Sequence, residues 1–85
     1  MHDYQWKLLQ SHPESLVRRL ILQFCDGTQA EAARRFNVSR QQVQLWVMRG
    51  FLPAFRVFEA EKIACGQITA EQFMDEFISK TNPVE

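Results

Sequence analysis

The sequence predicts an all-α domain, and three observations lead to that prediction. Only three glycines and three prolines interrupt the 85 residues, and apolar residues recur at helical spacing along most of the chain. No segment shows a convincing strand pattern, although Tyr4, Trp6 and Leu8 alternate near the N-terminus. A Ser or Thr is followed three residues later by Glu or Gln at four places, which is the capping-box pattern of helix N-termini. The four pairs are Ser11/Glu14, Thr28/Glu31, Ser39/Gln42 and Thr69/Gln72.

The first expected helix runs from about Pro13 to Cys25, and Asp26-Gly27 ends it because Gly adopts the left-handed conformation at low cost. Residues 1–12 are expected to form an N-terminal arm, in part extended. The helix should bury one apolar stripe, because its large aliphatic and aromatic residues fall on one face. That stripe consists of Leu16, Val17, Leu20, Ile21 and Phe24.

Two short helices with a minimal break come next. The first follows Thr28 and reaches about Phe36, and the second follows Ser39 and stops near Arg49-Gly50. This is the spacing of a helix-turn-helix. Such a unit needs a small residue where the helices cross, and Ala33 supplies it. The turn needs a residue that tolerates positive φ, which Asn37 can do, and an apolar plug, which is Val38.

A fourth helix is expected to start with Pro53 in its first turn and to end at Gly66. A fifth follows the Thr69 cap and runs to about Ser79, with Ile68 and Phe73 packing together across the cap as a hydrophobic staple. The expected organisation is therefore a five-helix domain over residues 13–80, with residues 81–85 as a frayed tail.

The helix after Ser39 should have two different faces. At about 100° per residue, Val43, Trp46 and Val47 point into the core. Gln42 falls on the inner edge, where it is expected to cap its own helix. The opposite face gathers side chains that suit base edges in a major groove, because Gln pairs with adenine, Arg with guanine, and aliphatic chains with the thymine methyl. This outer face consists of Arg40, Gln41, Gln44, Leu45 and Met48.

The net charge is zero, but the charges are unevenly distributed. Residues 32–58 contain five arginines and no acidic residue, whereas all ten acidic residues lie on either side of this segment. A basic centre with acidic flanks favours a polyanion on one face and limits non-specific binding. The five arginines are Arg34, Arg35, Arg40, Arg49 and Arg56.

Other classes of protein are not expected. No apolar run approaches the roughly 20 residues of a membrane span. The first ten residues lack the apolar region of a signal peptide, so we expect a cytoplasmic protein. Cys25 and Cys65 lack metal-ligand spacing and are expected to be reduced core thiols. His2 and His12 have no matching nucleophile or carboxylate pair, so we expect no catalytic residues, no metal and no cofactor.

The stretch QAEAARRFNVSRQQVQLWVMRG, residues 29–50, resembles the helix-turn-helix of the Cro/phage-repressor family. The continuation GFLPAFRVFEAEKIACGQITAEQF resembles the YdaS-like, Cro-like branch in particular, and the resemblance covers residues 15–73. One departure is Asn37, where the family usually has Gly. The resemblance implies base contacts and phosphate contacts at separate positions. Base contacts are implied for Arg40, Gln41, Gln44 and Leu45, and a phosphate contact for Gln29. Further phosphate candidates, on general grounds, are Thr28 at the same helix start, Ser39, Arg49 and, on the first helix of the motif, Arg35.

The resemblance implies a Cro-like repressor, of phage or prophage type, that is expected to bind a partly palindromic operator in double-stranded DNA as a homodimer. Five phenylalanines present more aromatic surface than so short a chain easily buries in its core. Part of this surface is therefore expected to lie at a dimer contact. They are Phe51, Phe55, Phe58, Phe73 and Phe77.

Two alternatives remain open. One is an antitoxin-type or other protein-interaction module that binds a toxin or another regulator and contacts DNA secondarily. The acidic residues of the last helix, Glu71, Asp75 and Glu76, favour it. The other is a MerR/excisionase-like DNA-binding protein, because VSRQQVQLWVMRGFLP also resembles the start of that group. That group continues into a basic β-wing, whereas FEAEKIACG is acidic and helical in pattern.

Overall fold

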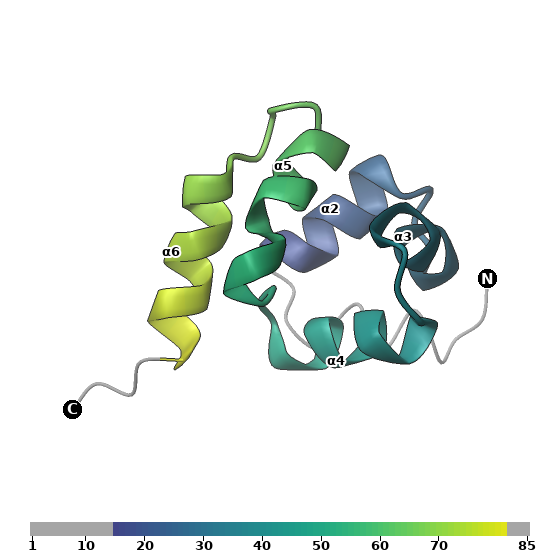
Figure 1. Ribbon diagram of the computed structural model, residues 1–85, viewed down its shortest axis with the longest axis horizontal. Helices are drawn as coiled ribbons and strands as arrows, with labels where there is room; N and C mark the ends of the chain where they lie inside the picture. The colour runs from purple at the N-terminus through teal and green to yellow at the C-terminus, as the bar shows by residue number, and fades with distance from the viewer. Residues whose placement is uncertain (1–14, 82–85) are drawn as a thin grey trace.

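Five α-helices and one 3₁₀ turn make up residues 15–81, the part of the chain that the computed structural model describes (Figure 1). No strand occurs in these residues, which confirms the all-α prediction. The expected N-terminal arm, the Ser11/Glu14 pair and the chain after Thr81 lie outside the described residues. The elements are α2 (Leu16–Phe24), α3 (Gln29–Phe36), α4 (Arg40–Arg49), η1 (Ala54–Arg56), α5 (Val57–Ile63) and α6 (Ala70–Thr81).

Helix α2 begins at Leu16, so the expected start at Pro13 is wrong. Ser15 is extended, at φ −68° and ψ 141°, and its hydroxyl accepts the backbone N–H of Val17 over 3.0 Å. This side chain is 3% exposed, which makes it a buried cap. Its role was missed because Ser15 has no Glu or Gln three residues later, and a capping box requires that partner.

In the capping boxes of α3 and α4, the hydrogen bond to the Ser or Thr hydroxyl forms as predicted. Thr28 accepts the N–H of Glu31, and Ser39 accepts the N–H of Gln42, each over 3.1 Å. The reciprocal bonds do not form. Glu31 binds arginines instead, and the Gln42 side chain is exposed, so its predicted capping role is wrong. Because Ser39 is itself exposed, its backbone N–H is open to hydration, and the long side chain gains little by reaching back.

The cap of α6 is complete in both directions. Gln72 donates its backbone N–H to Thr69 Oγ1 over 3.1 Å, and Thr69 donates its N–H to Gln72 Oε1 over 2.8 Å. Ile68 and Phe73 are both buried beside this cap, as a hydrophobic staple requires. The helix ends at Thr81, two residues beyond the expected Ser79.

The fourth expected helix is shorter and irregular at its start. Pro53 is extended, at ψ 149°, and is followed by the 3₁₀ turn before α5 begins at Val57. The helix ends at Ile63 rather than Gly66, because Cys65 adopts a left-handed φ of 55°. Cys65 is exposed, so the expectation of a core thiol holds for Cys25 but is wrong for Cys65.

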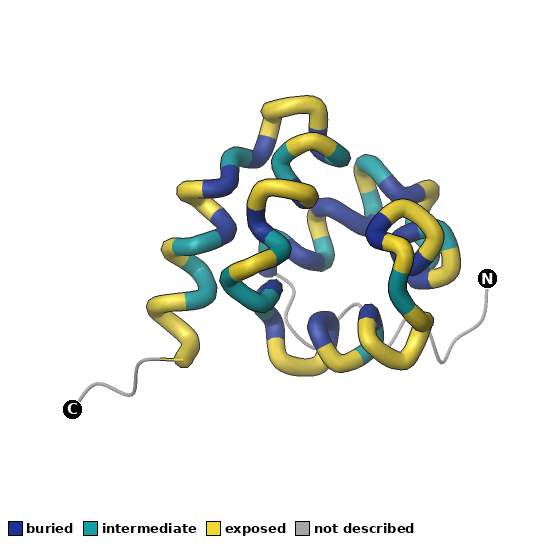
Figure 2. Tube along the Cα trace, viewed as in Figure 1, coloured by how far each residue is buried: buried dark blue, intermediate teal, exposed yellow. Residues whose placement is uncertain are grey.

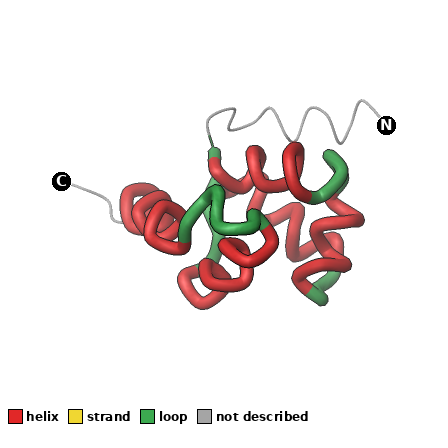
Figure 3. Tube along the Cα trace, turned by 90° about the horizontal axis from the view of Figure 1, so that it is seen from above, coloured by secondary structure: helices red, strands yellow, loops and turns green. Residues whose placement is uncertain are grey.

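The core lies between α2, α3, α4 and α5, with α6 packed against α5 at one end of the molecule (Figures 1 and 3). The stripe of α2 is buried at its centre, and Leu16 and Phe24 are only partly covered. Across residues 15–81, no helix combines the length and apolar character needed to cross a bilayer. The fully buried large side chains include Leu20, Ile21, Trp46, Leu52, Ile68 and Phe73.

Candidate nucleic-acid interface

The turn between α3 and α4 has the geometry that the sequence predicts. Asn37 is left-handed, at φ 59° and ψ 48°, and ends α3. Val38 donates its N–H to the Ala33 carbonyl over 3.0 Å, and its side chain packs against the core. Ala33 is 5% exposed, so a small residue does lie at the helix crossing. Two helices joined in this way form a helix-turn-helix.

The inward face of α4 fixes how the helix is rotated. Val43, Trp46 and Val47 are all buried, as expected. The Trp46 ring meets the Phe36 ring of α3 edge to face, with centroids 5.0 Å apart and an interplanar angle of 78°. This is a favourable aromatic geometry, and it locks α4 against α3. The opposite face of α4 must therefore point outward.

That outward face is accessible along its whole length, as the exposed lower edge of α4 in Figure 2 shows. Arg40 and Gln41 are exposed, and Gln44 is half-buried. Leu45 and Met48 are 41% and 49% exposed, so the face also offers two accessible apolar side chains. The Gln44 amide nitrogen lies 4.0 Å from the Met48 sulfur, one turn further along. Gln42 is also exposed, so the sequence analysis missed a third available glutamine on α4.

The beginning of α3 combines a cap with a buried amide. Thr28 caps the helix, and the next residue, Gln29, is 7% exposed. Its Nε2 atom is buried and has no hydrogen-bond partner among the described residues. A buried donor without an acceptor costs about 1–3 kcal/mol, which makes Gln29 Nε2 a candidate donor to a bound ligand. The N-terminus of a helix also favours anions.

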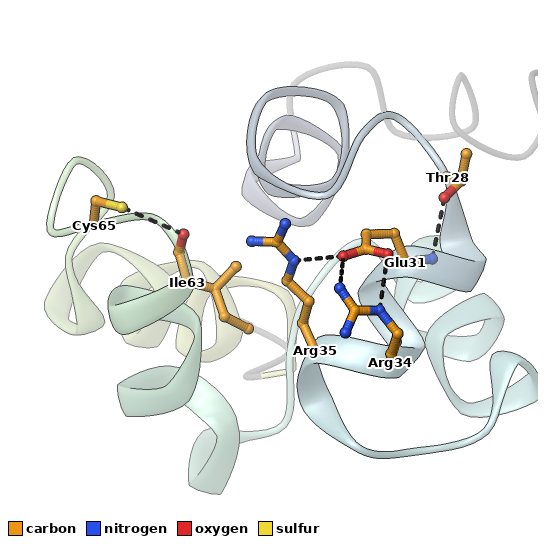
Figure 4. A network of polar contacts seen from close by, with 6 residues as sticks. All are labelled: Thr28, Glu31, Arg34, Arg35, Ile63 and Cys65. Atoms are coloured by element: carbon orange, nitrogen blue, oxygen red, sulfur yellow. Dashed lines mark hydrogen bonds and ion pairs between the residues drawn. The ribbon is translucent and has the colours of Figure 1, made fainter.

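Two arginines of α3 converge on one carboxylate (Figure 4). Arg34 donates its Nε–H to Glu31 Oε1 over 3.1 Å, and Arg35 donates its Nε–H to Glu31 Oε2 over 2.8 Å. These hydrogen bonds, from Arg34 first and then Arg35, lower the pKa of Glu31 to about 2. Arg35 is therefore already ion-paired, which reduces the charge it offers to a phosphate.

Of the three remaining arginines of the basic segment, one forms an ion pair and two do not. Arg56 forms an ion pair with Glu59 over 2.9 Å. Arg40 and Arg49 form no ion pair with any residue in the range 15–81, and both are exposed. Since they are the first and last residues of α4, the uncompensated positive charge of the segment lies at the two ends of this helix.

Nothing in the described part of the chain suggests a metal centre. No group of three or more His, Cys, Asp and Glu side chains lies close enough together there to hold an ion. Burial raises the pKa of the Cys25 thiol to about 11, so it stays protonated in the core. The Cys65 sulfur lies 3.9 Å from the Ile63 carbonyl oxygen, within its own turn (Figure 4).

The fold, the positive-φ turn and the anchored α4 define the protein as an all-α helix-turn-helix domain. A family model described as bacterial toxin YdaS matches residues 19–76, about two-thirds of the chain. The chain belongs to the YdaS family, which confirms the YdaS-like part of the predicted resemblance. No curated protein and no solved structure matches the chain.

Proposed function

We propose that the protein is a sequence-specific regulator of transcription that binds double-stranded DNA through the major groove. The observation that carries the proposal is the outer face of α4, an accessible row of amide and aliphatic side chains with an arginine at each end that forms no ion pair among residues 15–81. Arg40 and Arg49 are nine residues apart, or about 13 Å along the helix axis. That span is comparable to the roughly 12 Å width of the major groove. Arg49 can therefore reach a phosphate at one edge of the groove while Arg40 and the residues that follow it face the bases.

Base contacts are assigned to four residues of the first two turns of α4. The exposed Gln41 and the half-buried Gln44 can each present an amide to adenine N6 and N7. Arg40 can pair with guanine, and Leu45 offers an aliphatic contact to a thymine methyl. Gln42 is a further candidate because its side chain is exposed beside them.

Phosphate contacts are assigned to the beginnings of α3 and α4 and to the end of α4. A phosphate oxygen at the start of α3 would accept from Gln29 Nε2 and satisfy this buried donor, with Thr28 beside it. Ser39 and Arg49 would hold the backbone on either side of the bases. Arg35 contributes less, because Glu31 already binds it.

The regulator would act as a homodimer, with half-sites about 34 Å apart on a partly palindromic operator. Phe55 supports a contact between copies, because this large apolar residue is 76% exposed. A large ring left in water is more stable when a second surface covers it. We assign no catalytic role to any residue, and no cofactor or metal is part of the proposed function.

Selection of bound duplexes from random DNA at near-physiological salt tests this proposal. We expect enrichment of one sequence with two inverted half-sites. The matched control is the double variant Arg40→Ala/Gln44→Ala, which leaves the inward face of α4 unchanged and should enrich nothing. If the wild type enriches no sequence, or if both proteins enrich the same one, the proposal is wrong.

A second candidate is a toxin-type or antitoxin-type module that acts by binding another protein. The description of the family as a bacterial toxin favours it, as do the acidic residues of α6. The MerR/excisionase-like alternative is disfavoured, because residues 54–63 form helical structure where that group has a β-wing.

A further inference from the structure

The three acidic residues of α6 divide into two groups. Glu76 points inward, with a side chain only 10% exposed, and accepts the backbone N–H of Leu16 over 2.9 Å. Glu71 and Asp75 are exposed and form no ion pair among residues 15–81. Glu76 is thus part of the fold, whereas the charges of the other two are uncompensated.

Glu71 and Asp75 lie beside an open groove between α5 and α6, with a volume of about 300 Å³. Apolar side chains from both helices form most of its lining, and Phe58 is 68% exposed. The two carboxylates are four residues apart on one helix, so they lie on the same face, one turn apart. The lining residues are Val57, Phe58, Ala70, Glu71, Met74 and Asp75.

We propose that this α5–α6 groove binds an amphipathic, cationic helix of a partner protein. An apolar groove that receives the apolar face of a helix is a common mode of peptide recognition. A volume of 300 Å³ is at the lower limit for a ligand pocket, so it suits one or two anchoring side chains of a larger partner. Lys or Arg residues one turn apart on that helix would pair with Glu71 and Asp75.

The negative charge of the groove distinguishes between the classes of molecule that could bind there. A nucleic acid or an anionic lipid surface would bring phosphates against the carboxylates of Glu71 and Asp75, which is repulsive. A second copy packed groove to groove would place four carboxylates along one apolar seam, with the same cost. A cationic helix is the occupant whose charge complements the groove.

The position of the groove separates this site from the beginning of α3, where a phosphate contact is proposed. Helix α6 lies at the end of the molecule away from α3 (Figure 1). A helix bound beside α6 therefore leaves the beginning of α3 free to contact a phosphate. The proposal holds whether or not α4 binds DNA, so the two can fail independently.

Selection from a library of randomised helical peptides displayed against the full chain tests the proposal. We expect enrichment of peptides with apolar residues at helical spacing and with Lys or Arg flanking them. The variant Phe58→Ala should bind the enriched peptide about tenfold more weakly, because exposed aromatic anchors dominate such contacts. Glu71→Gln/Asp75→Asn should bind it about 3- to 30-fold more weakly at low salt, and this loss should shrink as salt is added.

Asp26→Asn is the matched charge control, because Asp26 is exposed but does not line the groove, and it should bind the peptide as the wild type does. Three outcomes overturn the proposal. One is the absence of enriched peptides. The second is an enriched peptide that binds Phe58→Ala as tightly as the wild type. The third is a wild type that sediments as a dimer while a groove variant sediments as a monomer, since the groove would then be the contact between copies.

Discussion

The Glu76 carboxylate of α6 accepts a hydrogen bond from the backbone N–H of Leu16, at the first turn of α2, over 2.9 Å. The same carboxylate oxygen lies 3.5 Å from Lys80 Nζ, and Lys80 donates to the carbonyl of Gly50 over 3.0 Å. Gly50 is the residue that ends α4. The last helix therefore connects the beginning of α2 to the end of the helix that we assign to DNA.

Replacing Glu76 should destabilise the fold by about 1–3 kcal/mol, because the Leu16 N–H would lose its acceptor and Lys80 would lose one of its two partners. Urea denaturation of Glu76→Ala measures this free energy of unfolding. Glu71→Ala is the matched control on the same helix and should change it by less than about 0.5 kcal/mol, since that side chain is exposed. Equal effects of the two substitutions would contradict the role of Glu76.

Replacing Trp46 should cost about 3–5 kcal/mol, because a buried ring is removed from the contact between α3 and α4. Thermal unfolding followed by circular dichroism measures the loss. Leu45→Ala, next along the same helix but 41% exposed, should leave the melting temperature almost unchanged. If Trp46→Ala had the same melting temperature as the wild type, the rotation assigned to α4 about its axis would be wrong.

The contribution of Glu31 to stability should depend on pH in a defined direction. Its pKa falls from 4.5 to about 2 in the folded protein, so the folded state favours the ionised form. The stabilisation is complete above about pH 4.5 and is lost as the pH falls toward 2. The difference in melting temperature between the wild type and Glu31→Gln should therefore be constant above this range and shrink within it.

Glu71→Gln serves as the control for that titration, because the Glu71 carboxylate has no ion pair among residues 15–81. Its melting temperature should follow the wild type at every pH in the series. A difference between wild type and Glu31→Gln that stays the same down to pH 2 would mean that the Arg34 and Arg35 contacts do not hold Glu31 ionised.

The two cysteines should differ in reactivity toward a thiol reagent such as dithionitrobenzoate at about pH 8. Cys65 is exposed, whereas Cys25 is buried and burial raises its pKa to about 11, so its reactive thiolate is scarce. We expect one fast equivalent in the native protein and two in denaturant. Native Cys65→Ser should show no fast reaction, and a fast reaction in that variant would mean that the core opens readily.

The sequence was sufficient to predict features that depend on neighbouring residues. The caps at Thr28, Ser39 and Thr69 and the left-handed Asn37 each follow from a pattern within a few positions. The inward face of α4 follows from its apolar spacing in the same way. These features predicted the helix-turn-helix and therefore the surface that it exposes.

Features that depend on residues far apart could not be predicted in this way. Glu76 lies 60 residues from Leu16, so no local pattern reveals that it completes the cap of α2. Glu31 has the capping-box spacing, but two cationic partners on its own helix compete for its carboxylate and displace the reciprocal bond. For Gln29, the sequence resemblance indicated the position, and the structure adds that its amide is buried without a partner.

The most direct test of the DNA-binding proposal compares Gln44→Ala with Gln29→Ala on the selected duplex and on duplexes that differ from it by one base pair. Fluorescence anisotropy at fixed salt gives the dissociation constants. We predict that Gln44→Ala loses about 1–3 kcal/mol on the selected duplex and loses its preference at one base pair of each half-site. Gln29→Ala should weaken every duplex equally, as the loss of a phosphate contact does. Equal weakening of all duplexes by Gln44→Ala would contradict base reading by α4.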